Sequence, residues 1–154
     1  SLYVNGMPAA SGSSVDVPLP EGEHTTVMID IVGDFQLLNT YTIFVNRAPD
    51  AMDSTWGTTR GMPVMLDVVS GTVDLDGDVV TVQAVTPLTT TNGTVTINDP
   101  ASSVTYTPTA DFVGASSFNF TVADGYGGMD EATATVNVVV TERNLFLPFI
   151  KQQQ

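Results

Sequence analysis

The chain has 154 residues, enough for one ordinary domain or for one and a half small ones. Hydrophobic residues make up 42% of it, so a packed core is feasible, and the formal net charge of −13 repels nucleic acid and anionic membranes. There is no cysteine, which excludes disulfides, and no apolar run approaches the roughly 18 residues that span a bilayer. Cations are therefore the expected partners of this surface.

Residues 1–46 predict short strands joined by turns. A strand at residues 2–4 runs into Asn5-Gly6, a strong hairpin signal. A second short strand is expected at residues 15–17, and alternating apolar residues predict two more, at 27–31 and 41–45. Four strands are about half of an immunoglobulin-type sandwich. We therefore expect an open apolar face and unpaired edges in this part.

A second unit begins after Ala48-Pro49, because proline interrupts a strand ladder and holds the preceding residue extended. Gly, Asn and Pro signals separate seven apolar runs, which we predict to be strands at residues 51–56, 63–69, 79–85, 94–98, 103–107, 117–123 and 132–140. Seven short strands at this spacing favour a Greek-key sandwich. The fold class predicted from the sequence is therefore all-β.

The alternation within these strands also predicts which side chains form the core, since successive residues of a strand point to opposite faces. The expected core consists of Leu66, Val80, Val82, Val95, Ile97, Val104, Tyr106, Phe112, Phe118, Phe120, Val122, Ala134, Val136 and Val138.

Several motifs follow one another in a fixed order along the second unit: Asp74-Leu75-Asp76-Gly77-Asp78, Asn92-Gly93-Thr94, Val104-Thr105-Tyr106-Thr107-Pro108, Asp111-Phe112-Val113-Gly114 and Asp124-Gly125-Tyr126-Gly127-Gly128. As a set, over residues 48–141, they resemble the tandem cadherin-like, Ig-like repeats of large bacterial surface and secreted proteins. The stretches Val4-Asn5-Gly6 and 40–47 resemble the C-terminal half of the same kind of sandwich. The expected division is a partial β-sandwich at 1–47, a complete sandwich at 48–141 and a tail at 142–154.

This resemblance implies extracellular adhesive or structural roles, often with calcium at domain junctions. Carried over by position, it assigns calcium ligands to Asp74, Asp76, Asp78 and Asp124. Clustered carboxylates on glycine-rich bends suit a cation that takes six to eight oxygens. The same stretches also fit plain Asp/Gly turns, and both interpretations stay open.

The chain also departs from the family pattern. Such repeats usually carry Glu where Arg60 stands, and an acidic run where Ser70-Gly71-Thr72 stands. These changes remove oxygen ligands and add a positive charge, so Arg60 is a candidate to pair with the aspartates in place of calcium. His24, without a second histidine or a cysteine, is expected to be solvated rather than a zinc ligand.

Residues 142–154 contain an apolar run that should not be left in water. Its large side chains are Leu145, Phe146, Leu147, Phe149 and Ile150. We interpret this run as an assembly segment that docks on an exposed sheet edge of the same or a neighbouring chain.

The function expected from the sequence is that of a non-catalytic extracellular structural, assembly or adhesion protein of a bacterial surface, sheath or filament. Its partners would be copies of itself or other surface proteins. The alternative is an accessory polysaccharide-binding module of a secreted enzyme, which predicts Trp56, Tyr3 or Tyr126 exposed on one face. An enzyme is not expected, since no set of nucleophile, base and oxyanion donors is evident.

Overall fold

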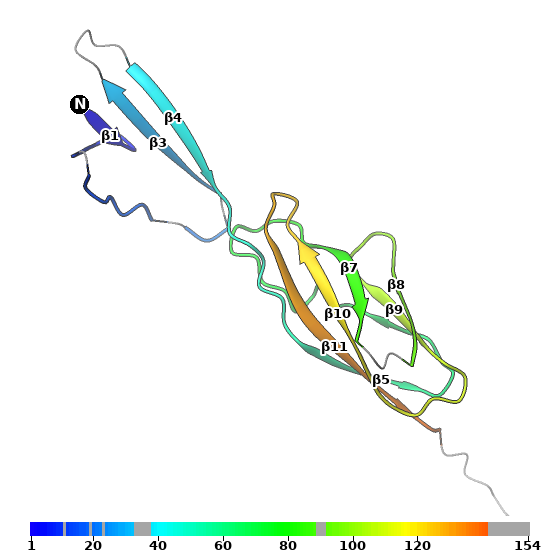
Figure 1. The fold of residues 1–154 in the computed structure, drawn as a ribbon. Coiled ribbons are helices and arrows are strands. Elements are labelled where there is room, and N and C mark those ends of the chain that lie inside the picture. The colour runs from blue at the N-terminus through cyan, green and yellow to red at the C-terminus, as the bar shows by residue number, and fades with distance from the viewer. Residues whose placement is uncertain (11, 19, 23, 33–37, 89–91, 142–154) are drawn as a thin grey trace, which may run out of the picture.

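The structure is a computed structural model that describes residues 1–10, 12–18, 20–22, 24–32, 38–88 and 92–141. In these ranges every regular element is a β-strand, which confirms the all-β prediction. The strands form two units that lie end to end (Figure 1). None of the described residues belongs to a helix long and apolar enough to cross a membrane.

The N-terminal unit is one four-stranded antiparallel sheet in the order β2-β1-β3-β4. Its strands are β1 (Leu2–Val4), β2 (Met7–Ala9), β3 (Thr25–Val32) and β4 (Leu38–Val45). Three of the four expected strands are present. The strand predicted at 15–17 is wrong, because Asn5 and Gly6 take positive φ values of 47° and 75° and fold residues 7–9 back onto β1 instead.

Cross-strand pairing gives this sheet two different faces, since residues directly opposite each other on antiparallel strands share a face. One face, called here the apolar face, carries Leu2, Val4, Met7, Ala9, Val27, Ile29, Ile31, Tyr41, Ile43 and Val45. The opposite face mixes apolar residues with Asp30 and several threonines. None of the described residues before Pro49 is fully buried, so this unit has no closed core of its own.

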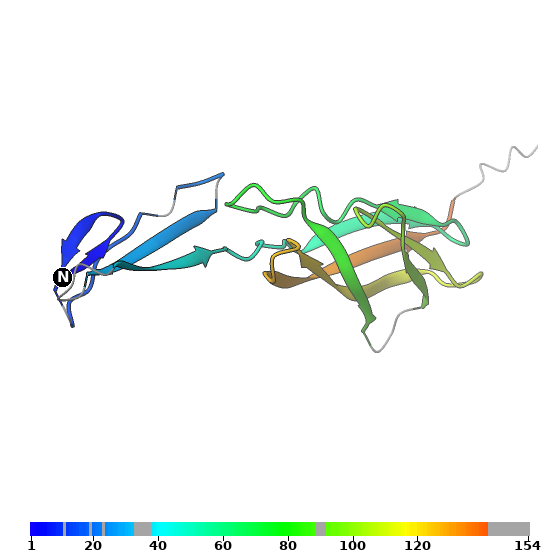
Figure 2. The same cartoon turned by 90° about the horizontal axis from the view of Figure 1, so that it is seen from above.

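The second unit is a sandwich of two sheets, with strand orders β5-β11-β10-β7 and β6-β9-β8 (Figure 2). The seven strands are β5 (Ser54–Thr59), β6 (Val64–Leu66), β7 (Thr81–Pro87), β8 (Gly93–Ile97), β9 (Val104–Pro108), β10 (Gly114–Ala123) and β11 (Met129–Val139). Strands β5 and β11 pair in parallel, whereas the other pairs are antiparallel. Each of the seven predicted runs overlaps one of these strands, although the boundaries shift by up to a few residues.

The core lies between the two sheets and is built mainly from the expected side chains. Tyr106, Phe118 and Phe120 are completely buried, and the Tyr106 hydroxyl donates a hydrogen bond to the Asn92 carbonyl at 2.9 Å. Val80, Val95 and Phe112 are only half-buried against this core, and Val68 joins it without having been predicted. Ile97 was wrongly placed in the core, because it ends the edge strand β8 and stays 36% exposed.

Candidate functional site: the acidic junction

The two acidic bends of the second unit meet the N-terminal unit at one end of the sandwich. The first bend, residues 74–78, contacts the N-terminal unit through a hydrogen bond of 2.5 Å from the Gly22 amide to the Leu75 carbonyl. The second, residues 124–128, is the hairpin between β10 and β11. Both bends contact the linker that follows β4, so the four predicted calcium ligands, Asp74, Asp76, Asp78 and Asp124, all lie at this junction.

Arg47, in the linker, is the cation that holds Asp76. Its backbone amide donates to Asp76 Oδ2 at 2.6 Å, and its Nε donates to Asp76 Oδ1 at 2.8 Å. The Arg47 Nη2 also reaches Asp76 Oδ1 at 2.5 Å and the Leu75 carbonyl at 3.1 Å. Asp76 is 6% exposed, and the backbone amide of Arg47, followed by its guanidinium, holds the pKa of this carboxyl below its usual value against the opposing effect of burial. Both carboxylate oxygens of Asp76 therefore already accept hydrogen bonds from Arg47.

The same guanidinium also bonds the N-terminal unit, at the segment that precedes β3. Its Nη2 donates to the Pro20 carbonyl at 2.5 Å. One arginine of the linker therefore bonds both the segment before β3 and the first acidic bend. A planar guanidinium suits this role because it presents several donors in fixed directions.

Asp124 is the buried carboxylate of the second bend, at 3% exposure. Its Oδ2 accepts a hydrogen bond from Asn46 Nδ2 at 2.6 Å, and its Oδ1 accepts from the backbone amides of Tyr126 at 2.7 Å and Gly128 at 3.0 Å. Burial alone would raise the pKa of Asp124, but the donors from Asn46, Tyr126 and Gly128 outweigh it and lower the pKa. The carboxylate thus closes the hairpin and ties it to the linker.

Asp74 and Asp78 have free capacity for a cation. Asp74 Oδ1 accepts from the backbone amides of Asp76 at 2.9 Å and Asp78 at 3.3 Å. Asp74 Oδ2 is buried without a hydrogen-bond partner in the described part of the chain, and so is Oδ1 of Asn46. One carboxylate oxygen each from Asp74, Asp78 and Asp124 lies within 4.8 Å of the others. Three carboxylates at this spacing can hold one metal ion.

The prediction that the His24 side chain is simply solvated is wrong, because it contacts residues of both units. Its Nε2 lies 2.7 Å from Asp78 Oδ2. Its ring centroid lies 4.6 Å from that of Phe44 and 4.5 Å from that of Tyr126, and the two latter rings are 5.9 Å apart. The N-terminal unit thus contributes His24 and Phe44, and the hairpin contributes Tyr126, to one aromatic contact across the junction.

Arg60 does not approach the aspartates, which corrects the proposed replacement of calcium by this residue. It follows β5, its backbone amide donates to the Val139 carbonyl, and its side chain is exposed. Strand β11 runs from Met129, beside the second bend, to Val139, so Arg60 lies at the opposite end of the sandwich. The arginine that pairs with an aspartate of the acidic bends is Arg47, not Arg60. The sequence signal for Arg47 was its position in the linker between the two units.

The aromatic residues of the polysaccharide-binding alternative do not gather on one face. Trp56 packs against the sandwich core and donates from Nε1 to Ser54 Oγ at 3.0 Å. Tyr126 is exposed beside the junction, whereas Tyr3 lies on β1, which pairs with the far end of β3. The five assembly residues of the tail, 145–147, 149 and 150, lie outside the described residues.

The family model described as "Bacterial Ig domain" matches residues 46–138. No curated protein matches the chain.

Similar solved structures include a nucleoside hydrolase-related hypothetical protein from Saccharophagus degradans that is associated with carbohydrate metabolism, with 19% identity over 60% of this chain, 26% of that chain and a TM-score of 0.47. Drosophila N-cadherin EC1-4 shares 12% identity over 82% of this chain and 35% of that chain, with a TM-score of 0.46. The endo-fucoidan hydrolase MfFcnA9 shares 16% identity over 90% of this chain and 28% of that chain, with a TM-score of 0.41.

The chain thus spans about a quarter to a third of the length of these proteins. Similarities at these TM-scores support no function. The family match covers more than half of the sequence and coincides with the seven-stranded sandwich. The chain therefore belongs to the bacterial Ig domain family.

Proposed function

We propose that this protein is a non-catalytic, extracellular structural component of a bacterial surface, sheath or filament, and that copies of it associate. In this role the junction acts as a mechanical coupling that keeps the two β-units in line. The family supports the proposal, because bacterial Ig domains are typically extracellular and non-catalytic.

The observation that carries the proposal is the density of bonds across the junction. Arg47 bonds Asp76, Asn46 bonds Asp124 and His24 bonds Asp78, so three side chains of the N-terminal unit and linker each hold a different aspartate of the sandwich. Charge-assisted hydrogen bonds of this kind are stronger than neutral ones. Bonds to both acidic bends oppose bending at the junction, which is what a stalk or filament under tension requires.

We further propose that Asp74, Asp78 and Asp124 hold one calcium ion in this coupling. Oδ2 of Asp74 and Oδ1 of Asn46 are buried acceptors without a donor among the described residues, and a cation would satisfy acceptors of this kind. Asp76 is left out of the ligand set, since Arg47 already occupies both of its oxygens. A bound ion would join the first bend directly to the hairpin that Asn46 holds.

The test is thermal unfolding with and without calcium. A ligand that binds only the folded state raises the melting temperature, and the rise grows with the logarithm of the ligand concentration once this exceeds the dissociation constant. We expect calcium to raise the melting temperature and EDTA to return it to the metal-free value, whereas Asp74→Asn should abolish the response. Asp111→Asn changes an exposed carboxylate outside the junction and should respond like the unmodified chain. An equal response in both variants would mean that the ion binds elsewhere.

A further inference from the structure

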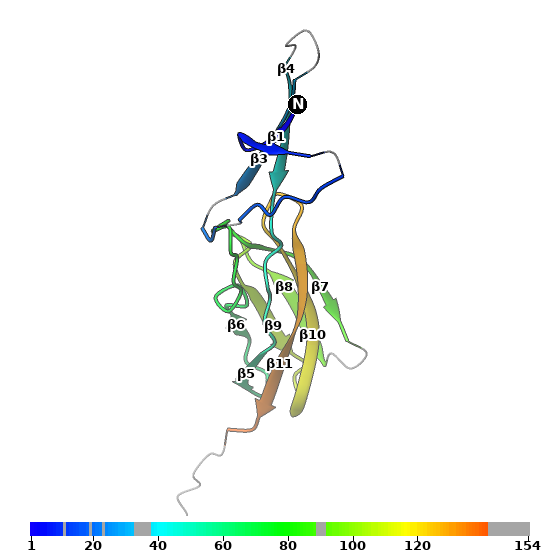
Figure 3. The same cartoon turned by 90° about the vertical axis from the view of Figure 1, so that its left-hand side faces the viewer.

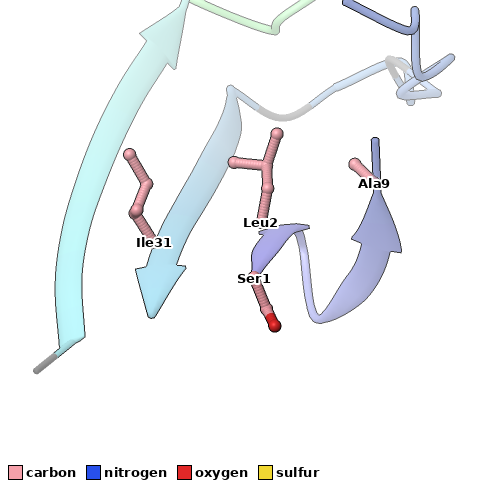
Figure 4. A pocket seen from close by; sticks show the side chains of 4 residues that line it. All are labelled: Ser1, Leu2, Ala9 and Ile31. Atoms are coloured by element: carbon pink, nitrogen blue, oxygen red, sulfur yellow. The ribbon is translucent and has the colours of Figure 1, made fainter. Parts of the chain in front are cut away.

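The apolar face of the N-terminal sheet has no second sheet packed on it in the described part of the chain. Its members Met7, Ile31, Tyr41 and Ile43 are between 42% and 57% exposed, and none of its members is charged. At its outer end Leu2, Ala9 and Ile31 line a hollow of about 460 Å³, in which the Leu2 and Ile31 side chains rise from the same side of the sheet (Figure 4). A sheet face of this composition is normally covered by a second layer.

We propose that residues 144–150 of a second copy of this chain cover the apolar face, so that copies join head to tail. This inference rests on the proposed self-association and names the two surfaces involved. The segment reads Asn-Leu-Phe-Leu-Pro-Phe-Ile, with five large apolar side chains and no charge.

Length and charge both fit this occupant. Seven extended residues span about 23 Å and the eight residues of β3 or β4 about 26 Å, so the segment can lie along the whole sheet. Residues 1–46 carry five acidic residues and no Lys or Arg, whereas residues 142–151 carry Arg143 and Lys151 against one acid, Glu142. The charges at the ends of the segment are therefore attracted to the unit that bears the apolar face.

The segment of the same copy cannot reach its own apolar face. Strand β11 starts beside the junction and runs away from it, so that Val139 lies at the pole opposite the N-terminal sheet (Figure 3). The ten steps from Met129 to Val139 cover about 33 Å, whereas residues 140–143 span at most about 14 Å. The chain would have to return along the full sandwich before it met the sheet, and it is too short to do so.

Head-to-tail docking has a consequence for the assembly. The apolar face belongs to the N-terminal unit, whereas strand β11, which precedes the segment in the chain, ends at the opposite pole. The contact joins two different surfaces and is therefore heterologous, and each added copy presents a fresh apolar face or a fresh segment. Such a contact is not limited to two copies: it closes into a ring where the rotation between copies allows, and otherwise extends into a filament. Pro148 lacks an amide donor, which suits an outer covering strand better than an internal one.

The test is sedimentation velocity of the full chain over a range of concentrations, with two pairs of variants. We expect dimers and longer species that grow with concentration, and their loss in Ile43→Asp, on the apolar face, and in Phe146→Asp, in the segment. Two control variants add the same charge elsewhere: Thr42→Asp on the opposite face of the same strand, and Gln153→Asp beyond the segment. Both should leave the distribution of dimers and longer species unchanged. Unchanged circular dichroism spectra and thermal unfolding of the full chain confirm that both units of each variant fold.

Mixing the two inactive variants gives the decisive result. One retains an intact segment and the other an intact apolar face, so an equimolar mixture should form a one-to-one dimer and nothing longer. Dimers of Phe146→Asp alone would show that two apolar faces pack on each other, which overturns this inference but leaves self-association standing. A full chain that stays monomeric at every concentration would overturn both, whereas the calcium response of the junction tests the structural coupling independently.

Discussion

Individual residues at the junction are constrained more tightly than an acidic bend requires. Gly128 is the clearest case, because a Cβ at this position would lie 2.7 Å from the Ala48 Cα and would collide with the Asp124 carboxylate. The hairpin therefore approaches the linker as closely as backbone allows, and only glycine permits that contact.

We expect Gly128→Ala to destabilise the protein by about 1–3 kcal/mol, the usual cost of forcing a methyl group into a packed site. Gly71→Ala is the matched control, because its Cβ would meet nothing within 4 Å. Urea unfolding of the two variants provides the comparison. Equal stabilities would show that the linker moves aside without cost.

The lowered pKa values of Asp76 and Asp124 predict a response to acid. Their pKa values lie below 3.8 in the folded protein, so the stability that they contribute is complete above pH 3.8 and is lost as the pH falls through the folded values. We expect the melting temperature to fall below pH 3.8, and to fall less in Asp76→Asn, which cannot titrate at that position. The measurement is the melting temperature of each protein as a function of pH. If it falls equally steeply in Asp76→Asn and in the unmodified chain, the lowered pKa of Asp76 does not contribute to stability.

At the scale of single elements, the sandwich follows from the period of two in its strands. Strand β10 alternates between buried Phe118, Phe120 and Val122 and half-buried Asn119 and Thr121, and this alternation is visible in the sequence. The residues at which strands begin and end follow less directly from the sequence. Strand β5 begins at Ser54 rather than at residue 51 because the preceding residues are used otherwise: Asp50 bridges Val73, and the Ala51 amide donates to Asp130.

We expect Phe120→Ala on β10 to cost about 3–5 kcal/mol, since the ring is completely buried and its removal leaves a cavity between the sheets. Met65→Ala on β6 removes a side chain that is 66% exposed and should change stability by less than about 0.5 kcal/mol. The free energy of unfolding in urea measures both. A small effect for Phe120→Ala would mean that the two sheets collapse onto the vacated space.

At the scale of the whole molecule, the arrangement of the two units depends on the linker arginine. Arg47 reaches the first acidic bend and the Pro20 carbonyl at once, whereas Arg60 stands exposed at the far pole. We expect Arg47→Ala to release the N-terminal sheet from the line of the sandwich, because the buried Asp76 then loses its cation and the guanidinium donors to Oδ1, and keeps only the backbone amide of residue 47. Arg60→Ala should have no such effect.

Small-angle X-ray scattering of the two variants separates these outcomes. The pair-distance distribution should broaden and the scattering should indicate variable inter-unit angles for Arg47→Ala only. If the profile of Arg47→Ala matches that of the unmodified chain, the remaining bonds of Asn46 and His24 suffice to hold the junction.

The sequence by itself determined the fold class, the seven strands of the sandwich and most of its core, because these depend on local alternation and on turn residues that act over a few positions. It also located the acidic bends, since Asp and Gly mark turns wherever they cluster. Only the tertiary structure decided which groups meet there: that Arg47 and not Arg60 pairs with Asp76, that His24 bonds Asp78, and that carboxylate oxygens of Asp74, Asp78 and Asp124 come within 4.8 Å of one another. The Arg47–Asp76 and His24–Asp78 contacts join residues 29 and 54 positions apart, and pairing over such separations follows from how the units pack rather than from any local pattern.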